Sequence, residues 1–453
     1  MAGEWYHLPF TQVIFDNDDR YTQAGISVNY RRRKRAFQHE EAHADDSDEI
    51  TPPLERDDVP SDAPRMITTA DELIKVIDHI RAAGLCAYDT EFIGEETYHP
   101  QICLVQLATT DMIAIIDPIA LPDLDPVWEM LADPAVMKLV HAGGVDLKYV
   151  PRAIGCEAAN VIDTQIAAAF SGLPWPVGLA RVIDAFTGHR LGKGHTFTNW
   201  DARPLSRQQL RYAADDVRYL PMLWSMLEKE LDRRGTLSWA LRECEVRLRI
   251  PDGFDPEPHL RKISKGMRLK PRARALLRAL VIERDRLAEI DDRPHRVLFP
   301  DSTLLELARK KPQTQEEMAS IRGLPRPTAQ KWFDEIVAIL DQVDTLELVP
   351  EKNPKPSSEA AAEQVVVDAL WMALCTRLYA QGIAPGMVIS RAQLASWYLT
   401  QKSNEQCELF AADDWRQEAI GEWLIDFIEG RTKLSIGWGD RGAIVDEHSD
   451  VTN

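Results

Sequence analysis

The clearest pattern of apolar and polar positions runs from residue 67 to about residue 150. Apolar residues at 73, 76, 77 and 80 recur at the spacing of a helix, and Thr69 or Asp71 can cap that helix. Three apolar runs follow, over 87–92, 102–108 and 112–116, with short turns between them. Such runs predict an antiparallel meander at the start of a mixed sheet.

Strand and helix patterns alternate beyond the meander. Residues 126–131 have the pattern of a helix and residues 138–141 that of a short strand, after which helical segments dominate. Strands that alternate with helices are typical of an α/β domain. We expect this domain to extend over residues 66–235.

Segments rich in proline and charge separate the α/β domain from its neighbours. Residues 1–65 combine a basic run, an acidic stretch and several prolines, and this composition predicts a disordered extension. Two proline-rich linkers bound a helical region over 266–345, and a second helical region is expected over 360–438. The last residues, 439–453, are expected to form a disordered tail.

Two carboxylates lie on the first predicted strand of the meander. Because alternate side chains of a strand share a face, Asp89 and Glu91 point the same way. Adjacent carboxylates repel each other unless cations bind them or water reaches them. A solvated strand end and a metal site both fit this pair.

Three further places carry polar residues that could serve chemistry. Small residues after His141 turn the chain into a helix that Asp146 opens. Gln165 follows two polar residues that can cap the next helix. An ordinary cap explains both of these places. Tyr212 and Asp216 lie one turn apart on a helix face that is expected to point toward the protein interior. A carboxylate on such a face needs a partner.

Composition narrows the class of protein. The chain has 453 residues, of which 45% are hydrophobic and 28% charged, as in an ordinary globular protein of about three domains. No apolar run is long enough to span a bilayer and no signal-peptide pattern is present, so we expect a cytoplasmic protein without membrane contact. The cysteines form no CxxC pair, so neither a zinc site nor a disulfide framework is predicted. A net charge of −19 argues against indiscriminate coating of nucleic acid, but not against a nucleic-acid enzyme whose carboxylates bind metal.

Taken in order, these residues resemble the ribonuclease D family within the wider DEDD group of 3′→5′ exonucleases. Residues 89–91 are similar to the first motif of the group, Asp-x-Glu. Residues 141–147 are similar to the second motif, whose functional residue is here Asp146. Tyr212 and Asp216 fit the third motif, Tyr-x-x-x-Asp, which marks the Tyr subclass. Each motif alone is weak, whereas three in the right order are a strong signal.

The resemblance implies a ribonuclease H-like mixed-sheet exonuclease domain, followed by all-α HRDC-like domains. It implies a catalytic set in which four carboxylates hold two divalent cations, Mg²⁺ or Mn²⁺, which suit all-oxygen ligands. Asp89, Glu91 and Asp216 would hold one ion, and Asp89 with Asp146 would hold the other. Tyr212 would orient the attacking water, because the pKa of a tyrosine is too high for a base at neutral pH.

The same resemblance predicts a substrate-binding set: His141, Gln165, Lys193, Trp200 and Arg203. The Arg-Pro-Leu sequence that begins at Arg203 is typical of the family. Asn199 stands where the family commonly has Asp, and His195 is a second departure. Both departures lie in the predicted substrate loop, so they leave the substrate preference open.

The first helical region resembles an HRDC domain, a small bundle that accompanies ribonuclease D and RecQ-type helicases. Pro271 opens a long helix there, Thr314 begins a capping-box pattern, and residues 261–278 are rich in Lys and Arg. Phosphate contacts and a solvated helix face both fit these basic residues. The second helical region is expected to be a diverged unit of the same kind, whose aromatic residues fit core packing better than base stacking.

Together these observations favour a monomeric 3′→5′ exoribonuclease that trims structured RNA, such as tRNA precursors, and releases nucleoside 5′-monophosphates. The alternatives are a related exonuclease that acts on DNA, and a catalytically inactive RNA-binding scaffold. The sequence shows no polymerase or helicase pattern, and the intact carboxylate set argues against a scaffold. Contacts to the 2′-OH distinguish RNA from DNA, and the sequence does not reveal them.

Overall fold

The computed structural model describes residues 52–94, 96–191, 199–250, 253–267, 269–348, 361–402, 408–439 and 442–449. Lys193, His195 and most of the expected N-terminal extension lie outside these residues. The chain divides into two compact units, one formed by residues 53–408 and the other by residues 1–52 with 409–453. The expected second helical domain, 360–438, spans this division.

A six-stranded mixed sheet forms the centre of the exonuclease domain, with the strand order β1-β4-β3-β2-β5-β6. The predicted meander is confirmed, because β3 pairs antiparallel with both β2 and β4. The outer strands β1, β5 and β6 pair in parallel with their neighbours. The strands are β1 (Arg65–Ile67), β2 (Leu85–Ile93), β3 (Gln101–Ala108), β4 (Ile113–Ile116), β5 (Met137–Val140) and β6 (Val161–Asp163).

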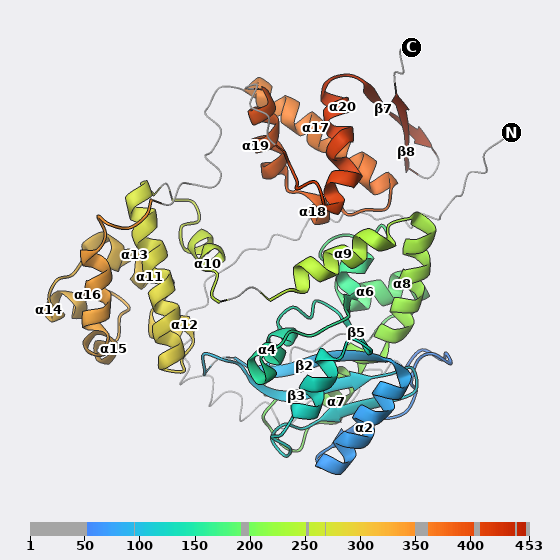
Figure 1. Cartoon of the computed structure of the whole chain (residues 1–453), viewed down its shortest axis with the longest axis horizontal. Coiled ribbons are helices and arrows are strands. Elements are labelled where there is room, and N and C mark those ends of the chain that lie inside the picture. Colours follow the sequence, from blue (N-terminus) through green and yellow to red (C-terminus); the bar gives the residue numbers. More distant parts are fainter. Residues whose placement is uncertain are drawn as a thin grey trace, which may run out of the picture. The chain divides into compact units, whose positions relative to one another are not determined.

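Helices cover both faces of this sheet (Figure 1). The domain's helices are α2 (Ala70–Ala83), α3 (Asp125–Ala132), the 3-10 turn η1 (Asp146–Lys148), α4 (Tyr149–Ile154), α5 (Thr164–Ala168), α6 (Leu179–Thr187), α7 (Arg207–Arg218), α8 (Leu220–Arg234) and α9 (Leu237–Leu248). On one face, α2, α3 and α4 pack against a core that includes Tyr88, Val105 and Leu107. On the other face, α7 contacts β2, β3 and β4 over a core that includes Leu104 and Ile115.

The outer half of β2 extends beyond its parallel neighbour. β2 pairs with β3 as far as Ile93 but with β5 only from Leu85 to Ala87. β5 ends at Val140, one residue earlier than predicted, and the chain then turns away into η1. One side of β2 is therefore left without a parallel strand from Tyr88 onward, at the place where the predicted carboxylates lie.

The HRDC region is a helical bundle with its own apolar core. As predicted, Pro271 opens its long helix and Thr314 caps a short one. Its helices are α10 (Pro256–Ile263), α11 (Pro271–Ile290), α12 (His295–Leu298), α13 (Asp301–Lys310), α14 (Gln315–Ala319), α15 (Arg326–Lys331) and α16 (Phe333–Asp341). The larger unit also contains α17 (Ala361–Ala380), α18 (Pro385–Val388) and α19 (Arg391–Lys402).

Several basic side chains of the HRDC region have protein partners. Arg274 and Arg278 both pair with Glu257, at 3.4 and 3.1 Å. Arg272 donates to the Leu346 carbonyl at 2.8 Å. These contacts favour a structural role for part of the basic run.

No helix in the described part of the chain is both long enough and apolar enough to cross a bilayer.

The N-terminal boundary of the exonuclease domain differs from the prediction. The disordered extension was expected to reach residue 65, yet Val59 is only 3% exposed. The buried Arg218 of α7 donates a hydrogen bond to the Pro60 carbonyl. A buried guanidinium needs acceptors, and residues just before β1 supply one.

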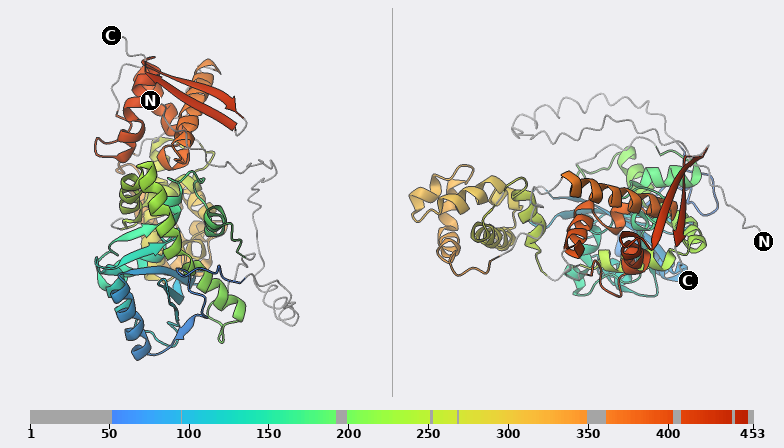
Figure 2. Two further views of the ribbon diagram at one scale, coloured as in Figure 1. Left: turned by 90° about the vertical axis from the view of Figure 1, so that its right-hand side faces the viewer. Right: turned by 90° about the horizontal axis from the view of Figure 1, so that it is seen from above.

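The C-terminal tail is a second correction. Residues from 439 onward were expected to be disordered, but β8 (Gly442–Ser449) pairs antiparallel with β7 (Thr432–Gly439). Both views of Figure 2 show this hairpin in red. The smaller unit also contains the π-helical turn η2 (Gln417–Gly421) and α20 (Glu422–Ile428). Leu434 and Ile436 show the alternation of a strand in β7, so the region expected to be helical over 360–438 also contains a strand. β7 is the pairing partner that orders the more polar β8.

Candidate active site

β2 presents two of the predicted catalytic carboxylates on one face. Asp89 pairs with Gln106 of β3, and Glu91 pairs with Leu104, in an unbroken register. Because Leu104 belongs to the core under α7, both carboxylates face that helix. The register shifts only after Glu91. The predicted common orientation of Asp89 and Glu91 is therefore confirmed.

Asp146 approaches β2 from the opposite face. The Tyr88 hydroxyl donates to the Asp146 carbonyl oxygen at 3.0 Å, and the Thr90 hydroxyl donates to its carboxylate. Asp146 is only 8% exposed. Tyr88 and Thr90 alternate with Asp89 and Glu91 along β2, so the same strand anchors a third carboxylate through its other face.

α7 carries Tyr212 and the fourth carboxylate, Asp216. Ser206 is its N-cap and forms a capping box with Gln209. The Gln209 side chain also donates to the Asn199 carbonyl at 3.2 Å, which ties the preceding segment to the helix. Tyr212 and Asp216 lie one helical turn apart and are both partly buried.

The four carboxylates interact electrostatically. Burial, and then the nearby charges of Asp216 and Asp146, raise the pKa of Asp89 well above its usual range. Burial and then the charges of Asp89 and Asp146 raise the pKa of Glu91 to about 8. Burial, followed by the charge of Glu91, raises the pKa of Asp216, and burial raises that of Asp146. No basic side chain among the described residues offsets these shifts.

The donor set suits a hard divalent cation, because all four groups offer carboxylate oxygens. A cation would also relieve the repulsion that raises their pKa values. As they stand, however, no three His, Cys, Asp or Glu side chains in the described part of the chain lie close enough together to hold an ion. The Thr90 hydroxyl holds the Asp146 carboxylate, and the Thr90 amide donates to Asp89 at 2.9 Å.

Tyr212 keeps its proton at neutral pH. Burial raises the pKa of its hydroxyl above the ordinary value, and the charges of Asp216, Glu91 and Asp89 raise it further. The hydroxyl is thus suited to donating a hydrogen bond and not to acting as a base. Its ring lies beside that of Trp200, with the two ring centres 6.0 Å apart.

Two residues of the predicted substrate-binding set meet at one backbone carbonyl. The His141 ring contacts the Val177 oxygen at 3.0 Å and the Thr164 hydroxyl at 2.9 Å, and the Gln165 amide donates to the same Val177 oxygen at 2.9 Å. Burial lowers the pKa of His141 to about 4, so its ring is neutral. These contacts hold the segment around Val177, and substrate binding by His141 and Gln165 remains a prediction.

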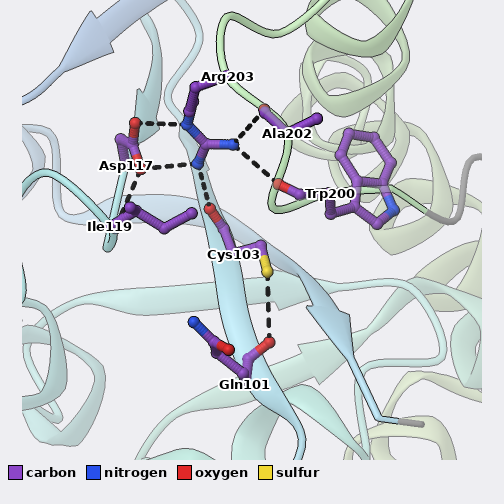
Figure 3. Close-up of polar contacts among 7 residues, drawn as sticks. All are labelled: Gln101, Cys103, Asp117, Ile119, Trp200, Ala202 and Arg203. Carbon is purple, nitrogen blue, oxygen red and sulfur yellow. Dashed lines mark hydrogen bonds and ion pairs between the residues drawn. The ribbon is translucent and has the colours of Figure 1, made fainter. Parts of the chain in front are cut away.

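The other described members of that set, Trp200 and Arg203, also contact protein. Trp200 is only 3% exposed and belongs to the core under α7. The Arg203 guanidinium pairs with Asp117 and with three backbone carbonyls (Figure 3). These contacts favour a structural role for Arg203 over a direct phosphate contact.

Sequence reasoning overlooked four residues around the site. Tyr88 and Thr90 hold Asp146, and Asp117 holds Arg203. Gln106 is fully buried opposite Asp89, and its amide has no hydrogen-bond partner among the described residues. The alternation of β2 carried a signal for Tyr88 and Thr90, whereas nothing local to Asp117 indicates a partner 86 positions away.

Comparisons with known proteins identify the family to which this fold belongs. Residues 64–232 match the family model of the 3′-5′ exonuclease domain, and residues 273–340 match that of the HRDC domain. A ribonuclease D of Gluconacetobacter diazotrophicus is 32% identical over 389 residues, which cover 82% of this chain and 95% of that protein. The chain belongs to the ribonuclease D family.

The ribonuclease D of Escherichia coli is similar to this chain in both sequence and structure. It is 32% identical over 374 residues, or 81% of this chain and 98% of that protein. The crystal structure of E. coli RNase D, described as an exoribonuclease involved in structured RNA processing, superposes with a TM-score of 0.64 at 30% identity. The superposition covers 81% of this chain and 99% of that one.

Membership of the ribonuclease D family settles the class of reaction. The protein is a 3′→5′ exoribonuclease, and its substrate is a nucleic acid. The predicted fold is confirmed, with a mixed-sheet exonuclease domain followed by a helical HRDC domain. Exonucleases of this fold use divalent metal ions.

Proposed function

We propose that this ribonuclease D trims the 3′ ends of structured RNA, such as tRNA precursors, and releases nucleoside 5′-monophosphates. The observation that carries the proposal is the cluster of four carboxylates at the open side of β2, whose charges raise one another's pKa. Repulsion of this kind destabilises the protein unless bound cations offset it, so the arrangement favours a cation-binding site. RNA processing by the related E. coli enzyme supports the substrate class.

In this proposal two divalent cations, Mg²⁺ or Mn²⁺, bind to the carboxylates. Asp89 and Glu91 face α7 and would hold one ion together with Asp216 of that helix. Asp146 comes from the other side of β2 and would hold the second ion with Asp89. When bound, the ions supply charge neutralisation and Lewis acidity to the attacking water and the leaving oxygen. The protonated Tyr212 hydroxyl would donate a hydrogen bond that orients the attacking water.

The test uses RNA and DNA oligonucleotides of one sequence, labelled at the 5′ end. Each is incubated with the full chain in Mg²⁺, in Mn²⁺ or in EDTA. The proposal expects a ladder that shortens from the 3′ end on RNA and disappears in EDTA. Faster shortening of DNA would favour the DNA-directed alternative, and bound but full-length RNA in every condition would favour a scaffold.

A second comparison tests the choice of RNA. A tRNA precursor with a 3′ extension and an unstructured RNA of the same length are given to the enzyme at equal concentration. The proposal expects shortening of the precursor to stop near the end of the folded stem. Equal and complete digestion of both RNAs would contradict a role in processing structured RNA.

We further propose that the enzyme acts as a monomer, which the sedimentation velocity of the full chain can test.

A further inference from the structure

The Arg203 guanidinium uses all of its hydrogen-bond donors inside the protein (Figure 3). Its Nε and one Nη2 proton donate to the two carboxylate oxygens of Asp117, each at 2.7 Å. The other Nη2 proton donates to the Cys103 carbonyl at 3.0 Å. The Nη1 protons donate to the carbonyls of Trp200 and Ala202, at 2.8 and 2.9 Å. An arginine has five N–H donors, so none is left for a phosphate.

Two partners of Arg203, Asp117 and Cys103, come from the central sheet. Cys103 lies on β3, and Asp117 directly follows β4. Asp117 is only 5% exposed and also accepts a hydrogen bond from the Ile119 amide at 3.0 Å, so its carboxylate is fixed from two sides. A bidentate pair of this kind sets geometry as well as charge. Arg203 therefore attaches the segment before α7 to the ends of two strands.

The attached segment leads directly to the catalytic tyrosine. The Trp200 carbonyl accepts from Arg203, and the Trp200 ring packs beside the Tyr212 ring in the core under α7. The Gln209 side chain links Asn199 to the first turn of α7. Two contacts thus connect the segment to the helix that carries Tyr212 and Asp216.

We propose that Arg203 and Asp117 form a clamp that sets the position of Tyr212 through Trp200, and that Arg203 does not bind the substrate phosphate. The clamp is the set of contacts among Asp117, Cys103, Trp200, Ala202 and Arg203. Its catalytic consequence rests on the function proposed above. In this arrangement Arg203 is a positioning residue, because it acts on the reaction only through Tyr212.

The first test separates turnover from binding in Arg203→Lys, which keeps the charge but supplies only three N–H donors. Misplacement of Tyr212 is expected to lower kcat by about 10–100-fold. The Kd for RNA in EDTA is expected to stay within about twofold of wild type, with an unchanged salt dependence, because no phosphate contact is lost. Arg207→Lys, which makes the same change at an exposed site of the next helix, is the matched control and should match wild type.

A weaker RNA affinity, with a slope of log K against log salt shallower by about 0.7, would show that Arg203 contacts a phosphate and would overturn the clamp.

The second test is a double-mutant cycle with Tyr212→Phe. If Arg203 acts through Tyr212, Arg203→Lys should lower the rate of Tyr212→Phe by less than about threefold, although it lowers the wild-type rate much more. An equal loss in both backgrounds would overturn the proposal. Trp200→Phe, which leaves the ion pair intact, provides the same cycle if Arg203→Lys does not fold.

The third test does not depend on activity. The full chain is labelled with 3-fluorotyrosine, and the ¹⁹F resonance of Tyr212 is identified by its loss in Tyr212→Phe. The clamp predicts that Arg203→Lys shifts or broadens this resonance and that Arg207→Lys leaves it unchanged. An unmoved resonance would overturn the clamp even in an active enzyme. A shifted resonance in a protein that does not shorten RNA would support the clamp and refute the proposed function instead.

Discussion

Asp117 and Asp216 are aspartates held near the same sheet, yet their surroundings shift their pKa values in opposite directions. The hydrogen bonds from Arg203 are the main cause that lowers the pKa of Asp117. Burial and the charge of Glu91 raise the pKa of Asp216. Arg203 thus supplies a permanent counter-charge to Asp117, whereas the four carboxylates of the proposed metal site have no basic partner among the described residues. This difference distinguishes a structural carboxylate from one that is available to a metal ion.

The largest effect is expected at the unpaired carboxylate. Asp216→Asn should lower the rate of RNA shortening by about a thousandfold or more, because a metal ligand is lost. Its melting temperature in EDTA should not fall, because the change removes a repulsive charge. Asp215→Asn is the control, since Asp215 pairs with Arg218 at 2.9 Å and belongs to the structural class. Wild-type rates from Asp216→Asn would refute the site assignment.

The next largest effect is expected at the paired carboxylate. Asp117→Asn should lower the free energy of unfolding by about 3 kcal/mol, because the partly buried Arg203 loses its counter-charge. Asp89→Asn should leave the same quantity unchanged or raise it in EDTA. Urea denaturation of both variants measures the difference. A similar loss in both would remove the distinction between the two classes.

Addition of a divalent cation should stabilise the folded protein, and this gain should depend on the carboxylates of the proposed metal site and not on the carboxylates paired with arginine. Mn²⁺ at about one hundred times its Kd should raise the free energy of unfolding by about 2.7 kcal/mol over the value in EDTA. Asp89→Asn should lose most of this gain, whereas Asp215→Asn should keep it. Thermal melting during a Mn²⁺ titration measures the gain. Equal stabilisation of both variants would place the bound ion elsewhere.

His141 is a buried base, and it extends the comparison from carboxylates to a basic side chain. Burial lowers the pKa of His141 from 6.5 to about 4, so the unfolded chain binds more protons than the folded one between these values. The stability that His141 contributes is therefore present at neutral pH and is lost as the pH falls from about 6.5 toward 4, by about 1–3 kcal/mol. His141→Gln should weaken this pH dependence in urea denaturation measured between pH 7 and pH 4.5. An unchanged slope would mean that the imidazole is already charged in the folded protein.

The smallest effect concerns two buried glutamines. Gln106 has no amide partner among the described residues, whereas Gln209 has partners in Asn199 and Ser206. Gln106→Met should raise the free energy of unfolding in EDTA by about 1 kcal/mol, and Gln209→Met should lower it by a similar amount. Urea denaturation distinguishes the two signs. A loss of stability in Gln106→Met would show that its amide has a partner such as bound water.

Local pattern was enough to predict the elements that carry the site. Alternation placed Asp89 and Glu91 on one face of β2, and helical spacing placed Tyr212 and Asp216 one turn apart on α7. These features depend on interactions between residues that are close together in sequence, so the sequence pattern is enough to predict them. The apolar alternation of β7 was equally visible, yet its residues were assigned to a helical region. The tail after it was wrongly predicted to be disordered, because β8 is polar and is ordered by pairing with β7.

Contacts between distant residues could not be predicted in this way. No property of Thr90 alone shows that its hydroxyl reaches Asp146, because that contact depends on how η1 returns to β2. Arg203 was predicted to bind substrate from its charge and motif, and its partner Asp117 is recognisable only in the folded sheet. The sequence indicates which residues are polar, whereas the fold determines which of them still have donors and acceptors for a ligand.

The order of the site along the chain has a consequence for synthesis on the ribosome. The strand with Asp89 and Glu91 is made first, Asp146 follows, and α7 with Asp216 is made near the end of the domain. Asp117 and Arg203 are 86 positions apart, so the clamp between them can also form only after this last part of the domain has been synthesised. A nascent chain therefore lacks a complete catalytic set until almost the whole domain has emerged. The four carboxylates can therefore come together only after α7 has emerged, while the helices of the HRDC region, which begin at Pro256, are still to follow.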